Sequence, residues 1–134
     1  MLFFAAGALA AMASWIGNRL ALKLMGAREI VLLAPLIEEA AKTGAAILTG
    51  SSLILTHGAF GLIEGVYDAW NAGLQGLQAG VASLAGHLFY GYITFMVMQR
   101  HHSWLFAVLS GYLLHMLWNV TVLKFLVKRR RQSA

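Results

Sequence analysis

The chain contains the stretch APLIEEAAK, residues 34–42, in which Glu38, Glu39 and Lys42 interrupt an otherwise apolar segment. A run of about 20 apolar residues is long enough to cross a bilayer as a helix. A charged group at the centre of such a helix costs about 2.5–3.5 kcal/mol on insertion scales, and it is kept mainly where it serves a function. The stretch therefore predicts a membrane-spanning helix that carries functional acidic groups.

The composition of the whole chain supports a membrane protein. Of its 134 residues 60% are hydrophobic and 11% are charged, whereas a soluble domain is about 25% charged. Turn-forming residues break the apolar runs at four places. We predict an all-α polytopic transmembrane helix bundle, a single domain over residues 1–134, with five spanning helices at residues 2–24, 29–49, 53–72, 77–99 and 103–127.

The basic residues indicate topology and do not indicate a nucleic-acid partner. The net charge is +5, but apart from Lys42 and Arg100 the positive side chains lie within residues 19–28 and at the end of the chain. Cytoplasmic segments of membrane proteins collect Lys and Arg. We therefore predict that residues 128–134 form a basic cytoplasmic tail and that lipid is a partner. Cysteine is absent, which excludes disulfides and thiolate catalysis.

Polar groups on four of the predicted helices lie at a similar membrane depth. At 1.5 Å per residue, the glutamate pair, Glu64, His87 and His115 all fall near the middle of their helices. Polar residues placed by chance would scatter in depth. We therefore predict that these side chains meet in a polar cavity at the membrane midplane.

The residue types at this depth suit hydrolysis. Glu38 and Glu39 could activate a water molecule, and Asn119, four residues after His115, could donate to an oxyanion. Glu64, His87 and His115 are ligand types that suit Zn²⁺, although a metal-free glutamate mechanism is equally compatible with the pattern.

The remaining ionisable side chains at these depths have simpler expected roles. The four-residue spacing of Glu38 and Lys42 predicts an ion pair between them. His57, His101 and His102 fall near predicted helix ends, so we expect them to be solvated loop residues.

Four short motifs resemble those of one protease family. The sequence EEAAK at 38–42 resembles an EExxK motif, FGLIE at 60–64 an FxxxE motif, and HMLWN at 115–119 an HxxxN motif, with a histidine helix at His87. In this order they are similar to the PrsW family of intramembrane proteases, which is related to the CPBP/Abi group and to the type II CAAX prenyl endopeptidases. The resemblance covers about residues 30–122.

The resemblance implies a catalytic core at residues 30–122 and an intramembrane metallo- or glutamate protease. Its substrate would be a membrane protein similar to an anti-sigma factor, in a bacterial or archaeal cytoplasmic membrane. By motif position, Glu38 would be the base, Glu39 its neighbour, and Asn119 a supporting donor. Glu64, His87 and His115 would surround the metal or the water.

Two other classes of protein fit the same residues. Buried Glu, His and Lys side chains could relay protons or bind a cation in a small transporter. The same side chains could also lock helices together in a membrane scaffold without catalysis. The sequence leaves the substrate, the metal and the oligomeric state open.

Overall fold

The computed structural model is built from α-helices. It describes the backbone of residues 1–132, and side chains over residues 1–26 and 32–122. The predicted all-α class is confirmed, and no strand occurs within the described backbone. The helices are α1 (Leu2–Met25), α2 (Ala27–Thr49), α3 (Leu53–His101) and α4 (Trp104–Gln132). Most of the predicted basic tail falls where no side chain is described, and residues 133–134 lie outside the described backbone.

The boundaries between helices follow local backbone signals. Gly50 ends α2 in the left-handed conformation, with φ 64° and ψ 24°, which glycine adopts without steric cost. Ser52 begins α3, and its side chain accepts a hydrogen bond from the amide of Leu55, as a helix N-cap does. Pro35 lies inside α2 and does not end it.

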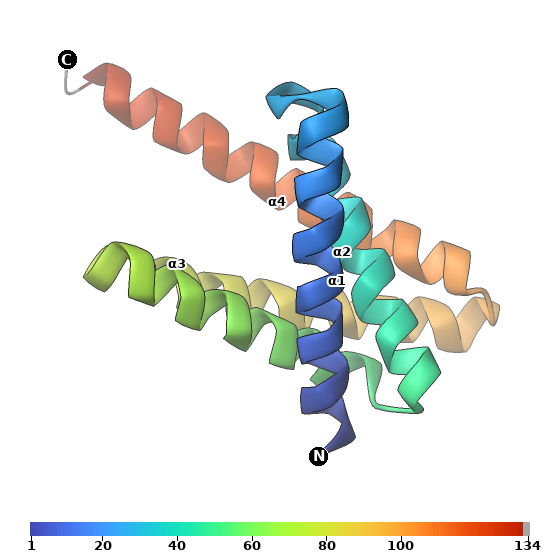
Figure 1. The fold of residues 1–134 in the computed structure, drawn as a ribbon. Coiled ribbons are helices and arrows are strands. Elements are labelled where there is room, and N and C mark those ends of the chain that lie inside the picture. Colours follow the sequence, from blue (N-terminus) through green and yellow to red (C-terminus); the bar gives the residue numbers. More distant parts are fainter. Residues whose placement is uncertain (133–134) are drawn as a thin grey trace.

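The segments predicted as two helices at 53–72 and 77–99 form one long element, α3, that reverses direction. Gly73 has φ 58° and ψ −133°, which is non-helical and accessible mainly to glycine. The chain doubles back there, as the green and yellow parts of Figure 1 show. Below, the first arm is residues 53–72 and the second arm is residues 74–101.

Glycines bring the two arms of α3 into backbone contact. A Cβ atom on Gly80 would lie 2.7 Å from the carbonyl oxygen of Gly65, and one on Gly65 would lie 3.0 Å from the oxygen of Gly80. Small residues at helix interfaces allow such close approach in membrane proteins. The arms therefore face each other with little side chain between them.

The α1–α2 pair runs across the α3 hairpin, and α4 packs against α2 and α3 (Figure 1). A glycine also lies where α1 contacts α3, because a Cβ on Gly7 would lie 2.6 Å from the Cβ of Ala59. The charged side chains of α2 lie near this crossing. Helices that cross in this way leave room between them where they diverge.

The interior contains many polar side chains, and the surface exposes many large apolar ones. Glu39, Lys42 and His57 are completely buried, whereas Leu48 and Trp70 are 88% and 89% exposed. A soluble protein rarely exposes so large an apolar surface. Within the described backbone, two helical segments are long and apolar enough to cross a membrane, namely Leu53–His101 and Trp104–Val122.

Candidate functional site

The two adjacent glutamates of α2 face different surroundings. Successive residues of an α-helix point about 100° apart, at 3.6 residues per turn. Glu39 consequently points into the interior among α3 and α4 and is completely buried. Glu38 points toward α1 and a cavity, with 12% of its side chain exposed.

Glu39 joins side chains from three helical segments. Its Oε1 atom accepts hydrogen bonds from Lys42 Nζ at 2.6 Å and from His115 Nδ1 of α4 at 3.0 Å. Its Oε2 atom lies 3.5 Å from Nδ1 of His57, on the first arm of α3. A buried carboxylate is tolerated only when it is paired and hydrogen-bonded. This side chain therefore ties α2 to α3 and α4.

The ion pair of Lys42 differs from the one predicted. The four-residue spacing favoured Glu38 as the partner, but that prediction is wrong, because the ammonium group bonds Glu39, three residues away. Both Lys42 and Glu39 have no exposed side-chain area. Since an unpaired charge in the interior is the more costly one, the fully buried carboxylate takes the ammonium.

A hydrogen-bonded chain continues from Lys42 to the second arm of α3. Lys42 Nζ donates to His87 Nδ1 at 2.8 Å, and His87 Nε2 then donates to Glu64 Oε2 at 2.7 Å. Ser83 donates to the same oxygen at 2.6 Å. Because an ammonium group can only donate, it fixes the neutral tautomer of His87 with its proton on Nε2.

Glu38 is less constrained than Glu39. Its Oε1 accepts a hydrogen bond from Asn18 of α1 at 3.3 Å. Its Oε2 is buried and has no hydrogen-bond partner in the described part of the chain, and it lies 3.8 Å from Nε2 of His115. The bond from His115 Nδ1 to Glu39 leaves that Nε2 atom facing Glu38.

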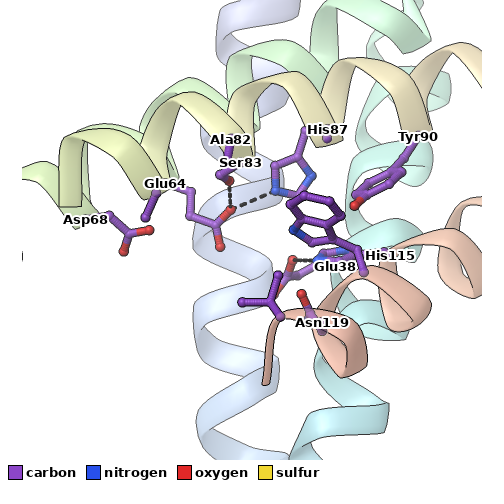
Figure 2. A pocket seen from close by; sticks show the side chains of 13 residues that line it. Glu38, Glu64, Asp68, Ala82, Ser83, His87, Tyr90, His115 and Asn119 are labelled. Carbon is purple, nitrogen blue, oxygen red and sulfur yellow. Dashed lines mark hydrogen bonds and ion pairs between the residues drawn. The ribbon is translucent and has the colours of Figure 1, made fainter. Parts of the chain in front are cut away.

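A cavity of about 250 Å³ opens beside Glu38. Figure 2 shows Glu38, Glu64, His87 and His115 directed toward it, with Asn119 on the neighbouring turn of α4. Three carboxylates line this cavity, and the Glu39 carboxylate and the Lys42 ammonium group lie behind it. This excess of acidic groups favours the presence of a proton or a cation. The full lining is Glu38, Glu64, Asp68, Ala79, Ala82, Ser83, Gly86, His87, Tyr90, His115, Trp118, Asn119 and Val122.

One group of side chains at the cavity has the composition of a metal site. Glu38, His87 and His115 each offer a ligand atom, and these atoms lie within 4.8 Å of one another. The bond between His115 and Glu39 resembles the carboxylate–histidine pairs that orient metal ligands. The group contains Glu38 where the sequence pattern predicted Glu64, whose carboxylate instead accepts hydrogen bonds from His87 and Ser83.

The structure brings together most of the residues that the sequence singled out. Glu38, Glu64, His87, His115 and Asn119 all line the cavity. Glu39 does not line it, and lies behind His115 as the residue that orients the ring.

Sequence reasoning missed Asn18 and Ser83, and it placed His57 wrongly. His57 is completely buried, although a solvated position near a helix end was predicted, because α1 and the second arm of α3 cover the start of α3. His57 precedes Glu64 by seven residues, or two helical turns, so the two side chains lie on the same face of the helix. This spacing could have predicted that His57 is buried near the site. Asn18 was visible only as a lone amide at the end of an apolar run.

No protein family, curated protein or solved structure matches this chain. The resemblance drawn from the four motifs therefore stays a prediction.

The geometry predicts that Lys42 is essential for stability. The substitution Lys42→Met should lower the free energy of unfolding by about 3–5 kcal/mol, because it leaves Glu39 buried without its cation. The double variant Glu39→Gln/Lys42→Met should recover part of this loss. Thermal unfolding in detergent micelles measures both. Lys23→Met, at an exposed position of α1, is the control, and a loss as large as that of Lys42→Met there would contradict the prediction.

Proposed function

We propose that the protein is an intramembrane endopeptidase that hydrolyses a peptide bond of a membrane-protein substrate with a glutamate-activated water. The observation that carries the proposal is the placement of Glu38. It lines a cavity with an oxygen that has no hydrogen-bond partner in the described part of the chain. It also faces a histidine that a second, buried glutamate holds in orientation. The apolar outer surface supports a site within lipid.

We also propose that the chain crosses the membrane five times, with α1, α2, both arms of α3, and α4 as spans. The exposed leucines and tryptophans would then face acyl chains. The hairpin at Gly73 supplies two spans within one element. The polar cluster at the helix crossing would lie near the midplane, and the C-terminal end would be cytoplasmic.

In the proposed reaction Glu38 is the general base. It removes a proton from water as the water oxygen attacks the carbonyl carbon of the substrate. Asn119, on the cavity wall, donates a hydrogen bond to the developing oxyanion. The tetrahedral intermediate then breaks at its C–N bond, and Glu38 returns the proton to the leaving amine. Glu39 acts through His115 and does not touch the substrate.

Zn²⁺ would require His87 to exchange its hydrogen bond with Lys42 or with Glu64 for the metal. His87 and His115 with a glutamate, Glu38 from the geometry or Glu64 from the motif, would then hold the ion. The bound ion would supply a Lewis acid that polarises water or the substrate carbonyl. If Glu38 were a ligand, Glu64, which also lines the cavity, would be available as the base.

A second crevice supports a peptide substrate. It measures about 260 Å³, lies between α1 and the first arm of α3, and shares Glu38 and Glu64 with the cavity. A helix that is to be cut must unwind, which exposes backbone groups that need partners in lipid. Ser14 and Asn18 line this crevice, and each has a buried oxygen without a hydrogen-bond partner among the described residues. These oxygens could accept hydrogen bonds from substrate amides.

The chain of hydrogen bonds from Glu39 through Lys42 and His87 to Glu64 favours a second candidate, a proton or cation transporter. Flux into proteoliposomes that depends on Glu64, without peptide hydrolysis, would support this candidate. A non-catalytic scaffold would show neither flux nor hydrolysis. The resemblance to the PrsW family favours the protease, with a substrate similar to an anti-sigma factor.

The five-span topology predicts the side on which two loops lie. The chain has no native cysteine, so the labelling of a single introduced cysteine has no background from other thiols of the protein. In Gln75→Cys, at the turn of α3, a membrane-impermeant maleimide should react only in inside-out vesicles. In His101→Cys it should react only in right-side-out vesicles. Labelling of both positions from the same side would contradict five spans.

The substitution Glu38→Gln should lower the hydrolysis of fluorescently labelled casein in detergent micelles by about 10²–10⁴-fold, because the general base is lost. Asp68→Asn is the matched control, since Asp68 is a carboxylate on the same cavity but outside the histidine group. It should keep at least half of the activity. Turnover by Glu38→Gln at the wild-type rate would rule out its role as the base. Chelator treatment of the wild type decides whether a metal takes part.

Filling the α1–α3 crevice should block the substrate. We expect Ser14→Leu to reduce casein hydrolysis strongly, because the larger side chain occupies the space beside Glu38. Ala13→Leu is the control. Residue 13 neighbours Ser14 in the sequence but lines a different crevice, between α1 and α2, which its leucine side chain would fill. Equal activity in these two variants would place the substrate elsewhere.

A further inference from the structure

Behind the cavity, a second group of buried polar atoms lacks hydrogen-bond partners. Among the described side chains, these atoms include Glu39 Oε2, Thr94 Oγ1, and both ring nitrogens of His57. All three side chains are completely buried. Buried polar atoms in proteins nearly always have a partner, either in the protein or in an ordered water. Several buried polar atoms without hydrogen-bond partners in one region indicate that a ligand binds there.

Two glycines show that these atoms converge. A Cβ on Gly111 of α4 would lie 2.7 Å from Thr94 Oγ1 and 2.8 Å from Glu39 Oε2. Both oxygens therefore lie close to the position that a side chain at residue 111 would occupy. A Cβ on Gly91 would lie 2.7 Å from the Cβ of His57. Since Gly91 and Thr94 are three residues apart on one helix, His57 packs on the helix face that carries Thr94.

The chemistry of these atoms selects the ligand. A carboxylate oxygen can only accept, a threonine hydroxyl can donate and accept, and a neutral imidazole has one donor and one acceptor. A cation could not satisfy the imidazole N–H group. Lys42 already provides the positive charge beside Glu39. A water molecule both donates and accepts, and buried waters make about three hydrogen bonds.

We propose that one water molecule is bound between Glu39 Oε2, Thr94 Oγ1 and the His57 ring. It donates to the carboxylate and bridges the first and second arms of α3 to α2. With this water, both oxygens of Glu39 are saturated, so that Oε1 stays directed at His115. The water is structural and distinct from any water at Glu38, and the proposal does not depend on hydrolysis.

The test is a double-mutant cycle on the full chain in detergent micelles. Thr94→Val has nearly the same shape as the wild type and removes only the hydroxyl. If the water is bound, Thr94→Val and His57→Leu should each lower the melting temperature by roughly 3–6 °C. The double variant should lose clearly less than the two single losses together, because both residues bind the same molecule. Thr121→Val, at an exposed threonine that bonds its own helix, should leave the melting temperature unchanged.

The opposite results would overturn the proposal. Without a water, the Thr94 hydroxyl is an unsatisfied buried group, and its removal should leave the melting temperature unchanged or raise it. Fully additive losses would likewise show that no ligand is shared. A direct readout is magnetisation transfer from water to the ring of His57 in histidine-labelled protein. It should be present in the wild type and lost in Thr94→Val, and its absence in the wild type would refute the bound water even if His57→Leu failed to fold.

Discussion

The structure depends on one buried carboxylate, that of Glu39. It receives the Lys42 ammonium and the His115 ring on one oxygen and lies beside His57 on the other. These partners belong to α2, α4 and the first arm of α3, so a single side chain fixes how three segments meet. In lipid the alternative to these contacts is an uncompensated charge, which is a strong reason for the helices to pack in one arrangement.

This constraint gives the two adjacent glutamates different roles. Because neighbouring side chains diverge around a helix, Glu39 takes the bonds from Lys42 and His115, and Glu38 stays at the cavity with one oxygen that has no partner among the described side chains. The proposed base thus keeps the freedom to bind water, while its neighbour holds the histidine opposite. The arrangement provides a physical reason for a pair of glutamates where one would suffice for acid–base chemistry.

The apolar pattern and the depth of the polar residues were enough to predict an all-helical chain and the convergence of Glu38, Glu64, His87 and His115. The spacing rule failed at Lys42, because positions three and four residues back are both within reach on a helix. The choice between them is made by burial, which depends on how other helices pack. Position near a helix end likewise misplaced His57, since crossing helices cover that end. The family resemblance and the enzymatic activity stay predictions.

The close contact between Gly65 and Gly80 has a consequence for motion. Because their backbones are in contact, the two arms of α3 form one rigid unit. Glu64, Ser83 and His87 therefore keep fixed positions relative to each other. Any widening of the cavity that admits a bulky molecule must then come from movement of α1 or α4 relative to the α3 hairpin. This movement would open the helix interfaces beside Glu38 and His115.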